Sequence, residues 1–164
     1  MPMSPKLAET GLAVGELLKA RKQTIAVSES SAGGLINAAL VQVPGASAYY
    51  LGGAVVYTGI SREKILFISK EQMRGIRSAS EPYAQLAARQ IRERLGATWG
   101  LAETGASGPT GNRYGDKAGH ACIAVSGPMD AVLTLETGSA DREANMQQFA
   151  CRALELLESC LRKS

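Results

Sequence analysis

Residues 24–43 read TIAVSESSAGGLINAALVQV and contain three local patterns in succession. The apolar run Thr24–Ser28 is typical of a buried strand. Gly33 and Gly34 indicate a tight turn, and the apolar positions of Leu35–Val43 predict a helix. A strand, a tight turn and a helix in this order are typical of domains in which helices connect the strands of one sheet. We therefore predict an α/β fold that extends outward from this segment.

The rest of the chain continues this alternation of helices and strands. Helix caps and apolar periodicity predict four further helices, over Pro5–Lys22, from Ser61 through Leu66, from Ser80 to Gly96 and over Asp141–Leu161. Apolar runs predict strands at Ala54–Tyr57, Thr98–Ala102, Ala121–Val125 and Ala131–Leu135, the last two joined as a hairpin. These elements predict a single domain over residues 1–164, a three-layer α/β/α architecture with a mixed, mostly parallel sheet of about five strands.

The counts of reactive residues exclude several kinds of site. The chain has a single histidine, His120, which excludes polyhistidine zinc sites and two-histidine acid and base schemes. We therefore expect no metal and no cofactor. The three cysteines form no CxxC pair and predict reduced thiols in a cytoplasmic protein. A formal net charge of +3, without a block of like charge, predicts no nucleic-acid partner.

Residues 30–61 contain no charged side chain, which raises the question of a membrane segment. Pro44 and several glycines interrupt this stretch, and its hydroxyl and amide groups are costly in hydrocarbon. We therefore expect no membrane partner, and we interpret the stretch as a buried unit of strand, helix and loop.

Two loops are candidate ligand sites, because ligands of such sheets bind beyond the carboxyl ends of the strands. The turn Glu29–Gly34 opens a helix, so its free backbone N–H groups suit a phosphate or carboxylate. An ordinary helix cap with close glycine packing explains the same residues. The second loop, Thr104–Gly119, has 16 residues, a length typical of functional or mobile loops. Near its end Arg113, Lys117 and His120 are candidates for contact with an anion, and solvated charge is the alternative.

Arg142 is unusual at its predicted position in the first turn of the last helix. A cation there opposes the helix dipole and is mildly unfavourable unless an anion pairs with it. A bound anion is one explanation for Arg142. A salt bridge to Asp141 or Glu143 is the other.

Five strings in the same order carry a resemblance to a known family. They are ESSAGG at 29–34, PGASAYYLGGAVVYT at 44–58, ETGASGPTG at 103–111, DKAGHACIAV at 116–125 and ADRE at 140–143. Together they resemble the C-terminal domain of the competence-damage-inducible CinA proteins, over about residues 5–162. The best-known activity of that family is hydrolysis of the carboxamide of nicotinamide mononucleotide, which gives nicotinic acid mononucleotide and ammonia.

The resemblance implies roles for individual residues. Ser47 takes the position of the family's proposed nucleophilic serine, and Arg142 matches the arginine of the family string G-D-R. The implied catalytic residues are Ser47, Tyr57, Arg62 and Thr104, and the implied substrate-binding residues are Ser30, Gly33, Gly34, Gly105 and Arg142. The resemblance also implies a phosphorylated small-molecule ligand and a homodimer or higher homo-oligomer.

One catalytic position departs from the family pattern. The family string YSNEAK has its lysine five residues after the tyrosine, and the same count from Tyr57 reaches Arg62. Arginine does not readily give up a proton and is a poor general base. Lys64 lies two residues further on, about 200° around a helix, and is expected to point away from the site. Arg62 is therefore expected to clamp a phosphate or carboxylate, or to stabilise an oxyanion.

Two functions follow from the resemblance and this departure. The first is an amidohydrolase resembling nicotinamide mononucleotide deamidase, with Ser47 as nucleophile and Arg62 and Thr104 near the developing charge. The alternative is a non-catalytic nucleotide- or phosphate-binding module of the same fold, because Arg62 replaces the family's lysine. Release of ammonia distinguishes the two.

Overall fold

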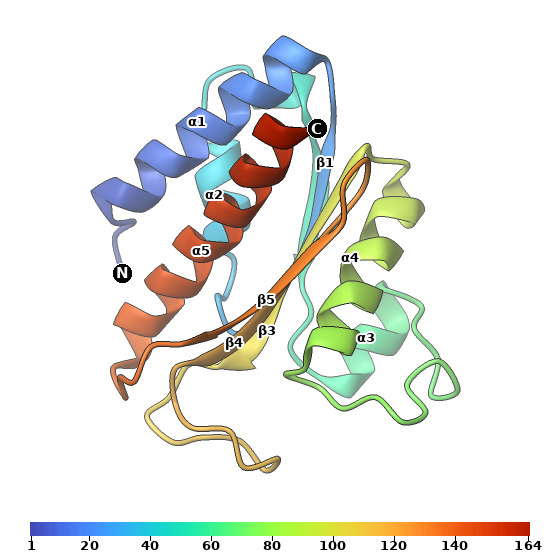
Figure 1. Cartoon of the computed structure of the whole chain (residues 1–164), viewed down its shortest axis with the longest axis vertical. Coiled ribbons are helices and arrows are strands. Elements are labelled where there is room, and N and C mark those ends of the chain that lie inside the picture. The colour runs from blue at the N-terminus through green and yellow to red at the C-terminus, as the bar shows by residue number, and fades with distance from the viewer.

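The computed structural model describes residues 1–164 and consists of a five-stranded sheet with helices on both faces (Figure 1). The helices are α1 Pro5–Arg21, α2 Leu35–Val41, α3 Gly59–Ile65, α4 Glu81–Leu95 and α5 Arg142–Lys163. The strands are β1 Ile25–Glu29, β2 Tyr50–Val55, β3 Trp99–Ala106, β4 His120–Ser126 and β5 Ala131–Glu136, and a short 3-10 turn at Ala46–Ala48 precedes β2. The three-layer α/β/α prediction is confirmed.

The strands lie in the order β2-β1-β3-β4-β5. β1 pairs in parallel with both β2 and β3, whereas β4 pairs antiparallel with β3 and with β5. Only β4 therefore runs against the other four strands, so the sheet is mixed and mostly parallel, as predicted. The chain between β3 and β4 returns through a loop, without a crossover helix, and this makes their pairing antiparallel. The carboxyl ends of β1, β2 and β3 meet at one edge of the sheet.

The helices divide into two groups, one on each face of the sheet. α1, α2 and α5 cover one face, and α3 and α4 lie on the other (Figure 1). The larger core cluster, between the sheet and the first group, includes Trp99, Phe149 and Tyr49, all fully buried. The smaller cluster lies beneath α4 and includes Tyr83 and Ile91. None of the helices combines the length and the apolarity that a membrane-crossing helix requires.

The helix ends follow the capping signals, with one correction. Ser4, Ser80 and Asp141 are N-caps whose side chains accept backbone N–H groups, and Gly96 ends α4 in the left-handed conformation. α3 was predicted from Ser61, with this serine as the cap, but it begins at Gly59. Thr58 is the N-cap, and Ser61 lies inside the first turn, where its hydroxyl completes a capping box.

Two strand boundaries also differ from the prediction. β2 spans Tyr50–Val55 instead of Ala54–Tyr57, because its pairing with β1 begins at Tyr50 opposite Ile25. β3 continues to Ala106, because it pairs with β4 along its whole carboxyl half. The predicted loop at Thr104–Gly119 is therefore shortened to residues 107–119.

The packing of α4 on the sheet depends on Gly100 of β3, where the helix backbone comes close to the strand. A Cβ atom at Gly100 would lie 2.0 Å from the carbonyl oxygen of Ala88 and 2.7 Å from Cβ of Arg92. Both are atoms of α4 at fixed positions, so the helix and β3 could not keep their present separation.

Gly100→Ala is therefore expected to lower the free energy of unfolding by about 2–3 kcal/mol, the cost of overpacking a core contact. The matched control is Gly59→Ala, because an added Cβ there meets only Nη2 of Arg62, at 3.6 Å. Urea unfolding followed by circular dichroism measures both variants. Equal stabilities of the two variants would contradict the close approach.

Candidate functional site

Two buried carboxylates hold the turn between β1 and α2. Glu103 of β3 accepts the backbone N–H groups of Ser30, at 3.0 Å, and Ala32, at 2.8 Å, together with the hydroxyl of Ser31. Glu29 accepts the N–H groups of Gly34, at 2.8 Å, and Asn37, at 2.6 Å, and the side-chain amide of Asn37. The protein's own carboxylates therefore take the place that an anionic ligand was expected to take.

This arrangement corrects the expectation that backbone N–H groups of the turn bind a ligand anion. The donors of Ser30, Ala32 and Gly34 are already paired with carboxylates. Gly33 and Gly34 have φ of 67° and 101°, so they shape the turn through a conformation that favours glycine. Neither glycine lines the pocket described below.

Burial raises the pKa of both carboxyl groups. The pKa of Glu29 rises from 4.5 to about 7, through desolvation first and the nearby charge of Glu103 in addition, against the opposing effect of its backbone hydrogen bonds. Desolvation also raises the pKa of Glu103, whose hydrogen bonds to the turn oppose the shift. N–H donors of the turn face both carboxyl groups and favour their ionised forms.

A polar pocket of about 230 Å³ lies beyond the carboxyl ends of β1, β2 and β3. Its wall brings together residues from the β1 turn, the segment after β2, α3 and the loop before β4. The lining residues are Ser30, Val56, Tyr57, Thr58, Gly59, Arg62, Ser78, Tyr83, Thr104, Arg113 and Tyr114. Most of them bear a hydroxyl, two are arginines and none is a carboxylate. We call it the Arg62 pocket.

Arg62 comes from α3, lines this pocket and is half-buried. Its Nη1 donates to the hydroxyl of Ser78 at 3.3 Å, and its guanidinium lies 5.7 Å from the centre of the Tyr83 ring. Its Nε is buried and has no hydrogen-bond partner. Lys64, two residues further on, does not line the pocket and pairs with Glu63 at 3.7 Å, with 75% of its side chain exposed.

Three other residues predicted for the site lie at this end of the sheet. Thr104 lines the pocket, and its hydroxyl accepts the N–H of Ala79 at 3.2 Å. Tyr57 lines the pocket, and its hydroxyl accepts Nη2 of Arg142 at 3.2 Å. Nη1 of Arg142 donates to the carbonyl of Gly108. Arg142 thus ties the segment after β2 to the loop after β3, in place of the predicted alternative pairing with Asp141 or Glu143.

Ser47 and Gly105 do not line the Arg62 pocket. Ser47 is exposed in the 3-10 turn at the amino end of β2, whereas Tyr57 follows the carboxyl end. The 6 residues of β2 separate the two ends by about 20 Å. Gly105 has a structural role, because a Cβ there would lie 2.2 Å from the carbonyl oxygen of His120 across the β3–β4 pair.

Several residues of the site carry no sequence signal. Ser78 lies in the chain between α3 and α4, and Tyr83 lies in the first turn of α4, so both reach the pocket through tertiary contacts alone. Asn145 of α5 is fully buried and donates to the carbonyls of Ser107 and Ser139. It fixes the start of the loop before β4. Arg113, which the sequence indicates as a candidate anion contact, does line the pocket.

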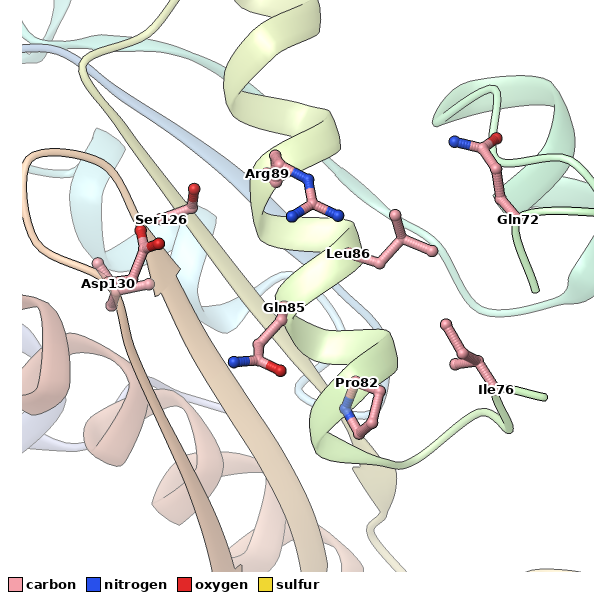
Figure 2. A pocket seen from close by; sticks show the side chains of 9 residues that line it. Gln72, Ile76, Pro82, Gln85, Leu86, Arg89, Ser126 and Asp130 are labelled. Atoms are coloured by element: carbon pink, nitrogen blue, oxygen red, sulfur yellow. The ribbon is translucent and has the colours of Figure 1, made fainter. Parts of the chain in front are cut away.

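A separate groove of about 450 Å³ lies between α4 and the β4–β5 turn. Figure 2 shows Gln85 and Arg89 extending from α4, with Ser126 and Asp130 across the groove. No residue predicted for the site lines this groove. No group of three His, Cys, Asp or Glu side chains that could hold a metal ion occurs in the structure.

Glu29→Gln is expected to reduce the pH dependence of stability. Since folding raises the pKa of Glu29 from 4.5 to about 7, the folded chain binds this proton more tightly than the unfolded chain. The free energy of unfolding therefore falls as the pH rises from 4.5 to 7, through this group. Urea unfolding across this window measures the difference between wild type and variant. The exposed Glu9→Gln serves as control, and a Glu29→Gln profile parallel to wild type would refute the assignment.

Comparison with known proteins places the chain in a family. A family model described as the CinA C-terminal domain matches residues 8–161. A CinA-like protein of Desulfosudis oleivorans is 37% identical over 156 residues, which cover 92% of this chain and 38% of the relative. A CinA-like protein of Nostoc punctiforme is 36% identical over 123 residues, or 75% of this chain and 30% of the relative.

The chain thus spans about a third of the length of these curated relatives. A solved structure of a CinA superfamily protein from Klebsiella pneumoniae has a TM-score of 0.90 and 25% identity to this chain, and the match covers 96% of this chain and 99% of that one. On the family model, the relatives and the shared fold, the chain belongs to the CinA C-terminal domain family.

Proposed function

We propose that the chain is an amidohydrolase that binds a phosphorylated carboxamide of the nicotinamide mononucleotide type in the Arg62 pocket. The supporting observation is the lining, which combines Arg62 with hydroxyl groups and contains no carboxylate. Arginine binds phosphate with a pair of parallel hydrogen bonds. The buried Nε of Arg62 has no partner within the protein, and an unpaired buried donor is unfavourable. A ligand oxygen at this position would satisfy it.

Amide hydrolysis needs a nucleophile, a proton acceptor and donors for the oxyanion. The hydroxyls of Ser30, Tyr57 and Thr104 are the donors that the lining offers to the carboxamide oxygen. Arg62 cannot serve as the proton acceptor, because a guanidinium retains its proton, so its contribution is attraction of the negative charge of the ligand. The lining contains no histidine, lysine or carboxylate to activate a nucleophile, so part of the machinery must enter from outside the pocket of one chain.

A second copy of the chain is a source for Ser47. β2 is an edge strand with no charged residue, and its Leu51 and Val55 are 44% and 42% exposed. Unprotected edges of this kind pair readily with another strand. If two copies of β2 pair antiparallel about an axis between Gly52 and Gly53, Tyr50 of one copy lies opposite Val55 of the other, and the turn that carries Ser47 lies near the segment that follows the partner's β2. Such a homodimer would bring Ser47 of each chain to the pocket of its partner.

A non-catalytic phosphate-binding module is the second candidate function. Two observations favour it, the distance between Ser47 and the pocket within one chain and the arginine at position 62. A module of this kind needs the Arg62 pocket alone. It would bind nicotinamide mononucleotide without releasing ammonia.

Wild-type protein is expected to release ammonia from nicotinamide mononucleotide, as measured by a coupled assay. Arg62→Gln is expected to weaken binding of this ligand, measured by calorimetry, by about tenfold or more, because a charged pair with phosphate is lost. Lys64→Gln, on the same helix but outside the pocket, is the control and retains both properties. Ser47→Ala is expected to bind nicotinamide mononucleotide as tightly as wild type and to release no ammonia from it.

Three outcomes decide between the candidate functions. Binding without turnover supports the binding module. No turnover by wild type together with turnover by Arg62→Lys refutes catalysis by the native chain. Equal binding by wild type and Arg62→Gln refutes the pocket itself.

The shared site predicts complementation between two inactive variants. Ser47→Ala and Arg62→Gln are expected to be inactive alone, whereas a random mixture of the two has one intact site in each heterodimer. Co-expression is therefore expected to restore about a quarter of the wild-type activity. Leu51→Lys should convert the dimer to a monomer in light scattering, and Leu12→Lys on α1 should not. No recovered activity in the mixture would refute a nucleophile shared between subunits.

A further inference from the structure

His120 lies at the start of β4, is 5% exposed and faces hydrogen-bond acceptors on both sides of its ring. Its Nδ1 is 2.5 Å from Oε1 of Glu136 on β5. Its Nε2 is 2.9 Å from the carbonyl oxygen of Ala79 and 3.6 Å from Oδ2 of Asp116. A neutral imidazole donates from one nitrogen only, whereas the doubly protonated ring donates from both. The two contacts are therefore satisfied together when the ring carries both protons and the carboxylates are ionised.

The Ala79 carbonyl belongs to a short segment at the wall of the Arg62 pocket. We call residues Arg77–Ser80 the strap. Ala79 is buried and has φ of 54°, a conformation that residues with a Cβ rarely adopt. Its carbonyl accepts Nε2 of His120, and its N–H donates to the hydroxyl of Thr104. The peptide groups on both sides of Ala79 are thus held by side chains from the sheet.

The strap contacts the pocket through two hydroxyls. Ser78 lines the pocket and accepts Nη1 of Arg62 at 3.3 Å. Thr104 lines the pocket and holds the N–H of Ala79. A change in the position of Ala79 therefore moves the partner of Arg62 and frees the hydroxyl of Thr104.

The charged groups around His120 favour its protonated form. Asp116, in the loop before β4, also pairs with Arg77 of the strap at 2.7 Å, and Glu136 comes from β5. The Cys122 thiol of β4 lies 3.7 Å from Nε2 of His120, and Glu81 of α4 reaches this side through Thr134. Burial lowers the pKa of His120, but the hydrogen bonds to Glu136 and Ala79 and the charge of Asp116 outweigh it and hold the pKa above 6.5.

We propose that His120, in its doubly protonated form, is a positioning residue that holds the strap against the Arg62 pocket, and that affinity for a phosphorylated ligand decreases when the ring loses a proton. The part concerning affinity rests on the proposed function. The part concerning the strap does not, because the contacts between His120, Ala79 and Thr104 exist without ligand.

The first test is the titration of the ring in the untagged protein. His120 is the only histidine in the chain, so its ring resonances in nitrogen-15 NMR need no further assignment. The midpoint of the ring titration is expected to lie above the ordinary value for histidine. The backbone amide resonances of Ala79 and Thr104 are expected to move with the same midpoint as the ring. A midpoint at or below the ordinary histidine value, or amides that do not move with the ring, overturns the proposal.

The second test is the affinity for nicotinamide mononucleotide in three proteins. Between about pH 6 and pH 9 the wild type is expected to lose about tenfold in affinity relative to His120→Gln. The amide of His120→Gln can donate to the Ala79 carbonyl at every pH, and comparison with it cancels the titration of the phosphate itself. His120→Ala is expected to bind weakly at every pH. Coincident pH profiles of wild type and His120→Gln overturn the proposal.

Glu136→Gln separates positioning by a charged ring from a merely structural role. Loss of the carboxylate beside Nδ1 is expected to shift the midpoint of the ring titration, and of the affinity profile, to lower pH. An unchanged midpoint contradicts the proposal. If nicotinamide mononucleotide and inorganic phosphate bind at no pH, the proposed function fails, and the resonances of Ala79 and Thr104 alone decide the role of His120.

Discussion

The position of the pocket wall depends on the hydrogen bonds that the β1–α2 turn donates to the buried carboxylate of Glu103. Glu103 is 2% exposed and lies on β3, the strand next to β1, so its two backbone contacts attach the turn to the centre of the sheet. Glu29 accepts the N–H groups of Gly34 and Asn37 and so attaches the start of α2 to β1. Removal of either carboxylate would leave buried N–H groups unpaired, which costs roughly 1–3 kcal/mol for each group. Because the turn is fixed, Ser30 has a defined place in the pocket wall.

The order and type of the elements could be predicted because local signals mark them. Serine and aspartate caps, the glycine after α4 and apolar periodicity each act within a few residues of the chain. The errors arose where pairing with a distant strand decides the boundary. β2 begins at Tyr50 and β3 ends at Ala106 because their neighbours continue to those points. The hydrogen bonds between Glu103 and the β1–α2 turn could not be predicted for the same reason, because Glu103 lies 73 positions after Ser30 in the sequence.

The family resemblance named several residues that line the Arg62 pocket, but it did not indicate how far apart the named residues lie. Ser30 and Tyr57 follow the carboxyl ends of β1 and β2, and Thr104 lies in the carboxyl half of β3. Arg62 reaches the same edge of the sheet from α3. Ser47 does not join them, because the whole of β2 lies between it and Tyr57. A strand that begins at Ala54, as predicted, does not indicate that Ser47 and Tyr57 lie at opposite ends of β2. Residues of the α3–α4 connection reach the pocket through tertiary contacts alone, so no spacing in the sequence indicates them.

Because β4 runs antiparallel to β3, a loop and not a crossover helix connects the two strands. The length of this loop affects the size of the pocket but has little effect on the stability of the sheet. Residues 107–119 close one side of the pocket as a hairpin loop between neighbouring strands. Asn145 holds the start of this loop, and His120 contacts Asp116 near its end. Doubling the length of such a loop costs only about 0.6 kcal/mol in chain entropy. Insertions or deletions between these anchors would alter the register of no strand. This part of the chain is therefore where evolution could adapt the domain to a larger or smaller ligand while the hydrogen bonds of Glu103 and the core stay as they are, provided that Asp116 keeps its contacts with Arg77 and His120.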